Sequence, residues 1–325
     1  LRGFDMMWIV GGAAIVKAID GMQENIVTRL LSKQLKHVDW QGFVFFDLIF
    51  PLFLFITGVS MVFSLDKALK QGDRKTAIKR VVTRSLMLFA VGVVYYGGIS
   101  RPWPNVQLGG VLQRIALCYL FGASIYCFIR STRGLLIASA ILLVGYWALL
   151  VFVPFPDLVL EEENVQAIAN QIGSQFHSDI AAAVPQRVSG LYEEGRNLTN
   201  YFDFRFLPGF KKQIYYINEG LLSTLPAIAF LLIGALAGQL LKNPSIPDKR
   251  KLILLITGGI AAILLGLIWS LLFPLIKRIW TSSFVVLTIG LSSLFLALFY
   301  YLIDMRRYQT WCQPFVWIGC NALTI

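Results

Sequence analysis

Charged residues are scarce in this chain. They make up 14% of its 325 residues, whereas hydrophobic residues reach 57% and the mean hydropathy is +0.67. Soluble globular domains carry about 25% charged residues. The composition therefore excludes an ordinary soluble domain and predicts an integral membrane protein.

Metal-binding side chains are also few. The sequence holds two histidines and four cysteines, and no CxxC spacing occurs among Cys118, Cys127, Cys312 and Cys320. Zinc sites need closely spaced thiolates or imidazoles. We therefore expect no metal centre, and we interpret the cysteines as apolar packing residues.

Long uncharged runs, by contrast, recur along the chain. A helix needs roughly 20 residues to cross a hydrocarbon core of about 30 Å. Such runs lie at 48–65, 85–100, 102–129 with Arg114 inside, 134–156, 220–241, 252–276 and 279–303, and shorter ones lie at 6–16 and 314–325. We predict an all-α, polytopic membrane helix bundle of eight to nine transmembrane helices. Because the last run stops inside a helix, we expect the chain to be truncated at its C-terminus.

The net charge of +11 comes from loops between these runs, so it gives no reason to expect nucleic-acid binding. Lysine and arginine gather in alternate loops, at 67–84, 130–133, 242–251 and 306–307. The positive-inside rule assigns these loops to the cytoplasm. The N-terminus is then cytoplasmic, and His37 lies on the opposite side.

One long segment, 157–219, breaks the membrane pattern. We predict a single transmembrane domain over 1–325, with 157–219 inserted between the fifth and sixth helices as an extracytoplasmic cap. Its aromatic rings and carboxylates suit a sugar-like or cationic ligand. A loop that only covers the helix ends would have the same composition.

The stretch HVDWQGFVFFDLIFPLFLF, residues 37–55, places Asp47 inside an apolar run. An ionisable group costs at least ~2.5 kcal/mol at a helix centre, so Asp47 needs an explanation. Pro51 lacks the N–H that would bond the carbonyl of Asp47, which predicts a kinked helix that lines a polar cavity. The alternative is a helix-start aspartate that caps its own turn.

The two chemical groups of this stretch can meet. If the helix begins near Gln41, Asp47 lies about 9 Å inside it, and His37 can fold back over the same point. A carboxylate that orients an imidazole is the arrangement of a general base. His37 taken alone is more typical of an interfacial or packing residue. Trp40 either covers the same pocket or anchors the helix at the interface.

Later spans carry further polar residues. Gln113 and Arg114 lie about one turn inside the fourth span, where Arg114 either contributes to a site or extends to the interface. Glu219 opens the sixth span and either binds a ligand or stabilises the helix N-terminus.

Two features remain in the later part of the chain. Gly234 and Gly238 form a GxxxG pair, which predicts close helix packing. Asn321 is an amide in an apolar run and has no partner that the sequence identifies.

These residues resemble a known family. His37 with WQGFVFFDLIFPLFLFITG, followed in order by GGVLQR, EGLLSTLPAIAFLLIGALAG, IWTSSFVVLT and PFVWIGCNAL, is similar to the motifs of the transmembrane heparan-α-glucosaminide N-acetyltransferases and their bacterial relatives. The resemblance covers nearly the whole chain. It implies transfer of the acetyl group of cytoplasmic acetyl-CoA to an amino sugar or glycan across the membrane, here the bacterial inner membrane.

The resemblance also implies roles for residues. The active-site histidine of the family corresponds to His37, and the motif aspartate corresponds to Asp47. The candidates for binding the thioester or the acceptor are Gln113 and Arg114, those for the CoA phosphates are Arg80, Arg84, Arg306 and Arg307, and those for the acceptor are Trp40, Glu219 and Asn321.

Several alternatives stay open at this point. His37 acts either as a general base or as an acetylated intermediate. A secondary transporter of a polar or sugar-like solute also has broken helices and buried charges, although no internal repeat is visible here. A non-catalytic relative would bind lipid or sugar. The packing glycines permit a homodimer. The acceptor, and whether nitrogen or oxygen receives the acetyl group, are not defined by the sequence.

Overall fold

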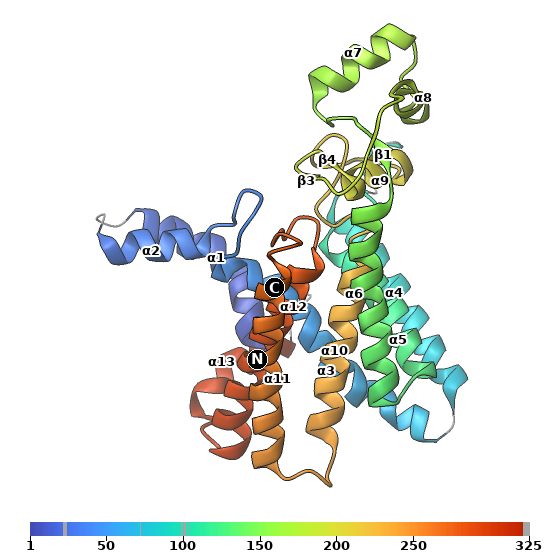
Figure 1. Cartoon of the computed structure of the whole chain (residues 1–325). Coiled ribbons are helices and arrows are strands. Elements are labelled where there is room, and N and C mark those ends of the chain that lie inside the picture. Colours follow the sequence, from blue (N-terminus) through green and yellow to red (C-terminus); the bar gives the residue numbers. More distant parts are fainter. Residues whose placement is uncertain (22–24, 72, 99, 101, 104, 321–325) are drawn as a thin grey trace. The chain divides into compact units, whose positions relative to one another are not determined.

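The computed structural model describes residues 1–325 except 22–24, 72, 99, 101, 104 and 321–325 (Figure 1). The first half contains α1 (Arg2–Asp20), α2 (Ile26–Leu35), the 3₁₀ turn η1 (Phe45–Leu48), α3 (Ile49–Lys70), α4 (Arg74–Tyr95), α5 (Val111–Phe128) and α6 (Thr132–Phe152). The middle contains β1 (Phe155–Pro156), α7 (Glu162–Ile172), α8 (His177–Ala183), β2 (Arg187–Val188), β3 (Tyr192–Glu193), β4 (Arg196–Asn197) and α9 (Leu198–Phe206). The last part contains α10 (Thr224–Lys242), α11 (Asp248–Trp269), α12 (Ser282–Phe299), the π-helix η2 (Tyr300–Met305), the 3₁₀ turn η3 (Thr310–Cys312) and α13 (Gln313–Cys320).

Six segments of the described chain are long and apolar enough to cross a membrane. They are Phe45–Asp66, Val111–Phe128, Thr132–Phe152, Thr224–Lys242, Asp248–Trp269 and Ser282–Met305. Together with the few short strands, they confirm the predicted all-α membrane fold. The chain is a multi-pass membrane protein.

The remaining expected spans are helical but are not among these six. The runs 6–16, 85–100 and 314–325 overlap α1, α4 and α13. One expected boundary was wrong: the run 102–129 becomes helical only at Val111. Pro102, Gly109 and Gly110 precede that point, and such residues disfavour a helix even where no charge interrupts the run.

The chain forms two compact units. Unit 1 comprises Leu1–Lys67, Phe230–Lys277 and Ser283–Ile325, and unit 2 comprises Ala68–Ala229 and Arg278–Ser282. The prediction of one transmembrane domain with a cap at 157–219 stays a prediction.

Close packing of α3 against α10 organises unit 1. A side chain at Gly234 would collide with the carbonyl of Phe55, and one at Gly238 would lie 2.7 Å from the carbonyl oxygen of Val59. The packing role predicted for these two glycines is therefore confirmed, because only glycine allows the backbones to approach so closely.

Unit 2 combines membrane helices with the long segment that follows α6. In α4, the side chain of Asp73 caps the helix by accepting the N–H of Thr76 at 2.9 Å, and α4 packs along α5. The segment between α6 and α10 has its own apolar core, formed by Leu158, Leu160, Val165, Ala169, Ile180, Ala181, Phe204, Tyr215 and Tyr216. It is therefore an ordered structure with helices α7, α8 and α9.

Candidate active site

The loop that carries His37 is fixed by backbone contacts within unit 1. After α2 ends at Leu35, Gln41 pairs with Ile276 in an antiparallel bridge, and the N–H of Gly42 donates to the carbonyl of Leu275 at 2.9 Å. Gly42 has φ +129°, a conformation that favours glycine. These contacts hold residues 36–44 against the segment that precedes Lys277.

Asp47 lies at the beginning of the membrane helix. The expectation that the helix starts near Gln41 was wrong, because the first helical turn is η1, Phe45–Leu48. Pro51 falls in the first turn of α3, where its missing N–H leaves no helical bond unmade. Asp47 is 1% exposed, and its Oδ2 accepts the N–H of Val44 at 3.3 Å, so it does cap its own turn.

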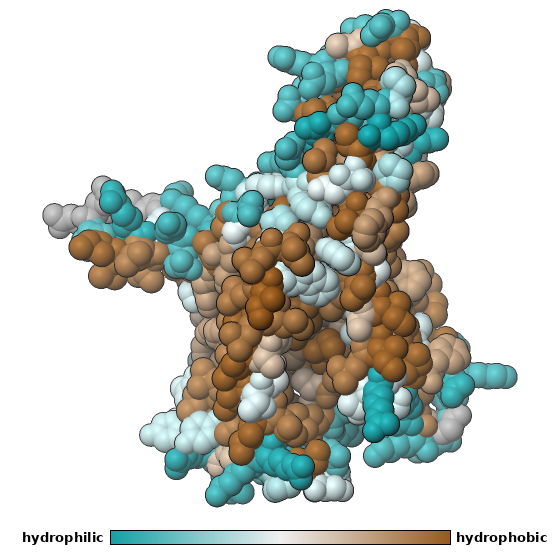
Figure 2. Space-filling model, viewed as in Figure 1, coloured by the Kyte–Doolittle hydropathy of each residue, from teal (hydrophilic) through white to brown (hydrophobic). Residues whose placement is uncertain are grey.

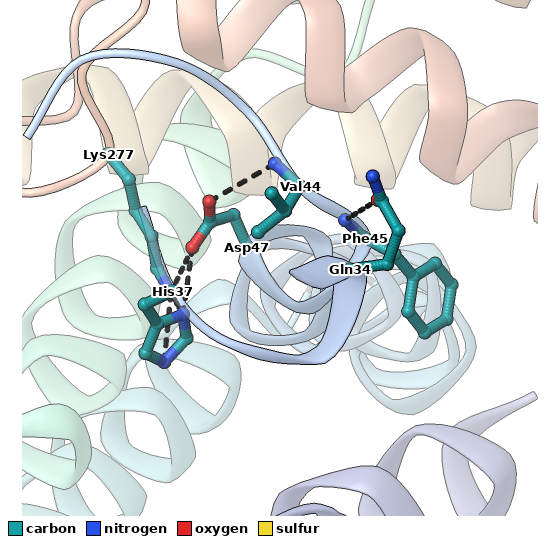
Figure 3. A network of polar contacts seen from close by, with 6 residues as sticks. All are labelled: Gln34, His37, Val44, Phe45, Asp47 and Lys277. Atoms are coloured by element: carbon teal, nitrogen blue, oxygen red, sulfur yellow. Dashed lines mark hydrogen bonds and ion pairs between the residues drawn. The ribbon is translucent and has the colours of Figure 1, made fainter. Parts of the chain in front are cut away.

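The other carboxylate oxygen of Asp47 contacts His37. The Nδ1 atom of His37 lies 2.8 Å from Oδ1 of Asp47 (Figure 3). Because an ionised carboxylate only accepts hydrogen bonds, Nδ1 is the protonated ring nitrogen in this contact and Nε2 keeps its lone pair. The side chain of His37 is 54% exposed, so a substrate can approach Nε2. Asp47 thus caps its own turn, which was the alternative to a kinked helix that lines a cavity, and it also contacts the imidazole.

Lys277 is a third member of this cluster. Its Nζ lies 3.1 Å from Oδ1 of Asp47, 2.9 Å from Nδ1 of His37 and 3.4 Å from Nε2 (Figure 3). A group 2.9 Å from Nδ1 that lay in the ring plane, directly outward from that nitrogen, would be about 5 Å from Nε2. The Nζ atom is only 3.4 Å from Nε2. The ammonium therefore lies outside the ring plane, and it leaves the in-plane directions of both nitrogens to other partners.

Sequence reasoning missed Lys277. It is 230 residues from Asp47, and the backbone bridge between Gln41 and Ile276 brings the two segments together. One signal was available: Lys277 and Arg278 form a basic pair in a short loop that the charge pattern assigns to the non-cytoplasmic side. The positive-inside rule disfavours basic residues there, so the pair required another explanation.

A second polar cluster surrounds Arg114 in unit 2. The Arg114 side chain is 1% exposed; its Nη2 donates to the carbonyls of Asn218 and Gly220 at 3.3 and 3.0 Å and to the hydroxyl of Ser223. Nε and Nη1 have no hydrogen-bond partner among the described residues. A buried guanidinium with open donors can bind a carbonyl or hydroxyl oxygen.

Asp203 of α9 belongs to the same cluster and was also missed by sequence reasoning. Its Oδ1 accepts the N–H of Leu221 at 3.0 Å, whereas Oδ2 has no partner within the described part of the chain. Burial raises the pKa of Asp203 to about 7, although the charges of Arg114 and Lys211 oppose this shift. A side chain at Gly220 would collide with the carboxylate, so a glycine is needed there.

Aromatic and amide groups complete this cluster. The Cζ of Arg114 lies 5.2 Å from the ring centroid of Trp280, which adopts φ +51°. This conformation is strained for a bulky residue. Gln113 is 1% exposed; its Nε2 donates to the carbonyl of Gln107 at 3.4 Å.

The other predicted binding residues are more scattered. Trp40 is half-buried in the loop between α2 and η1. Glu219 precedes α10 by five residues, so the alternative that it stabilises the N-terminus of that helix was wrong. Asn321 lies outside the described residues. Arg80 and Arg84 are exposed on α4, and Arg306 and Arg307 are exposed after η2.

Comparison with known proteins extends these observations. Residues 25–162 match the family model described as "Heparan-alpha-glucosaminide N-acetyltransferase, catalytic". The heparan-alpha-glucosaminide N-acetyltransferases of Mus musculus and Homo sapiens are 27% and 25% identical to this chain over 331 aligned residues. The chain is similar to this acetyltransferase family.

The similarity expected from the ordered sequence blocks is thereby confirmed. Each alignment covers 89% of this chain and 48% of the relative. The chain thus spans about half the length of the curated relatives that it matches. The family model includes the segment from His37 to Asp47 and also Arg114, so both clusters contribute residues to the matched region.

Proposed function

We propose that this protein transfers the acetyl group of cytoplasmic acetyl-CoA to an amino sugar or related glycan on the opposite side of the membrane, with His37 and Asp47 as catalytic residues. The similarity to named acetyltransferases supports the reaction class. The observation that carries the proposal is the 2.8 Å contact between Nδ1 of His37 and the buried Asp47 carboxylate, because it leaves Nε2 of an accessible imidazole as a base.

In the direct route, Nε2 of His37 removes a proton from the acceptor amine as its nitrogen attacks the thioester carbonyl. The C–N bond forms, the C–S bond breaks, and the imidazolium returns the proton to the departing CoA thiolate. Asp47 stabilises the transient imidazolium through Nδ1–H. In the covalent route, Nε2 itself attacks the thioester carbonyl and the CoA thiolate leaves; the amine then attacks the acetyl-imidazole, the Nε2–C bond breaks, and the proton lost by the amine neutralises the thiolate. Both routes use the same tautomer of His37.

Lys277 acts as a positioning residue in this proposal. Its ammonium lies 3.1 Å from the Asp47 carboxylate and balances that charge, and it also lies beside the imidazole ring. This contact holds the carboxylate in place, and with it the hydrogen bond that orients the His37 ring.

The binding roles follow from the charge and the open hydrogen-bonding groups. Arg114, through Nε and Nη1, and Gln113 bind the thioester or the acceptor. Arg80, Arg84, Arg306 and Arg307 bind the phosphates of CoA. Trp40, Glu219 and Asn321 contribute to acceptor binding. We also propose that the protein lies in a bacterial inner membrane with a cytoplasmic N-terminus, and that it can form a homodimer.

Labelled acetyl-CoA tests the reaction and separates the two routes. Purified protein in nanodiscs is incubated with acetyl-labelled acetyl-CoA, first alone and then with a panel of amino sugars. Label on His37 at one equivalent, transferred later to a sugar, supports the covalent route. Labelled sugar without labelled protein supports direct transfer. CoA binding without transfer to any acceptor would contradict an acetyltransferase, and uptake of a solute without acyl transfer would indicate a transporter.

A further inference from the structure

The helix α2 exposes an apolar face. Ile26, Val27, Leu30 and Leu31 are 80%, 64%, 58% and 46% exposed, and their positions place them on one side of the helix. Four large apolar side chains on one ten-residue helix form a continuous patch, and a continuous exposed patch marks an interaction surface.

The opposite side of α2 is polar and basic. It carries Thr28, Arg29, Ser32 and Lys33, and Lys36 follows the last turn. Figure 2 shows this division along α2, with teal residues on the upper side and brown residues on the lower side. An apolar face opposite a lysine- and arginine-rich face is typical of helices that lie in the membrane interface.

The contacts of α2 hold its end beside the beginning of a candidate membrane span. Oε1 of Gln34 accepts the N–H of Phe45 at 3.0 Å, and Phe45 is the first residue of the candidate span Phe45–Asp66 (Figure 3). Leu35 is buried, so the end of α2 is held against unit 1. Ten residues of helix extend about 15 Å, half of what a crossing needs. The helix can therefore lie along the interface but cannot span the bilayer.

We propose that α2 is an interfacial helix. Its apolar face inserts at the boundary between lipid headgroups and acyl chains, and its basic side chains contact anionic lipid phosphates. Because α2 ends beside the first residue of the adjoining span, the boundary of the bilayer would lie at the level of this face, and the charge of Arg29, Lys33 and Lys36 complements lipid phosphates. This inference does not depend on acetyl transfer. Because His37 follows α2 by two residues, the contact also sets the height of His37 above the lipid.

Site-directed spin labelling of the full chain tests the inference. Val27→Cys places a label in the middle of the apolar face, and Arg29→Cys is a matched control two residues on, 200° around the helix. Cys312 and Cys320 are replaced by serine so that they cannot react with the label. Cys118 and Cys127 are buried and are kept. The protein is reconstituted in nanodiscs with either zwitterionic lipid alone or added anionic lipid, and collisions of each label with oxygen and with an aqueous nickel chelate are measured.

The expected result is a label at position 27 that collides with oxygen at least several-fold more than with the nickel chelate, and a reversed ratio at position 29. Anionic lipid should reduce nickel access at position 27 further, and Lys33→Gln should weaken that effect. Equal nickel access at both positions would contradict the inference, because the apolar face would then be in water. A label at position 27 that neither reagent reaches would also overturn it, in favour of a second copy of the chain.

Discussion

At the scale of single residues, Asp47 connects three roles. One oxygen accepts the N–H of Val44 and fixes the first turn of the membrane helix, and the other contacts His37 and Lys277. The spacing of His37 and Asp47 in the sequence was enough to predict that they meet. Lys277 could not be predicted in this way, because its position depends on a backbone pairing between segments 235 residues apart, Gln41 and Ile276.

Replacement of Lys277 tests its positioning role. We expect Lys277→Met to lower kcat at neutral pH about 10- to 100-fold, by analogy with the loss of partners that orient metal-binding histidines. Lys277→Arg keeps the charge beside Asp47 and should restore most of the lost kcat, whereas KM should change little in either variant. A Lys277→Met protein with a normal kcat, or a Lys277→Arg protein that loses as much as Lys277→Met, would contradict this role.

Asp203 makes a second prediction at this scale, on stability. Its pKa of about 7 lies above the value near 4 of an unfolded aspartate. Between about pH 4 and pH 7 the folded protein therefore holds a proton that the unfolded chain has released. The contribution of Asp203 to the free energy of unfolding is fully present below about pH 4, is lost as the pH rises towards 7, and stays lost above it.

The comparison with Asp203→Asn isolates this effect. The variant keeps an oxygen for the N–H of Leu221 and cannot ionise. We compare the thermal unfolding midpoints of the two proteins in detergent. The midpoint of the variant minus that of wild type should increase by several degrees as the pH is raised from 5 to 8. A constant difference between the two proteins over that range would show that Asp203 does not titrate there.

At the scale of elements, hydrophobicity located the spans but placed the beginning of one too early, and the helix start assumed at Gln41 was also too early. The segments 41–44 and 102–110 are uncharged, yet residues 41–44, 102–103 and 105–110 are non-helical. In the first segment, Gly42 has a positive φ, and Gln41 forms a sheet-like bridge with Ile276. In the second, prolines and paired glycines precede α5. Local backbone chemistry therefore decided these boundaries, whereas the charge-free length alone predicted longer helices.

The α3–α10 contact gives a prediction for helix packing. Gly234→Ala places a methyl group against the carbonyl of Phe55 and should destabilise the protein by about 1–3 kcal/mol, as other overpacked sites do. Gly258→Ala in α11 is the control, because a side chain there meets no atom within 4 Å. The control should be stabilised by about 0.5 kcal/mol through helix propensity. Denaturant unfolding that ranks the two variants equally would contradict the packing account.

At the scale of the whole molecule, sidedness decides how a cytoplasmic donor could serve an acceptor on the other side. The charge pattern places the α10–α11 loop in the cytoplasm and the segment 157–219 outside. With Cys312 and Cys320 replaced by serine, Ser245→Cys and Gln175→Cys each put one exposed thiol in these two segments. In intact spheroplasts, a membrane-impermeant maleimide should label position 175 and should label position 245 only after lysis. The reverse pattern would invert the proposed topology.

The most direct test of the central claim is the acetyl-transfer activity of a His37→Asn protein. An asparagine amide can replace Nδ1–H as a donor to Asp47, but it has no counterpart of Nε2, so it removes the base while preserving the contact. His177→Asn is the matched control, because the other histidine donates through Nδ1 to the carbonyl of Phe204 at 2.7 Å. We predict that His37→Asn binds CoA normally and loses at least about 100-fold in kcat, with the control unaffected. Full activity in His37→Asn would contradict the account.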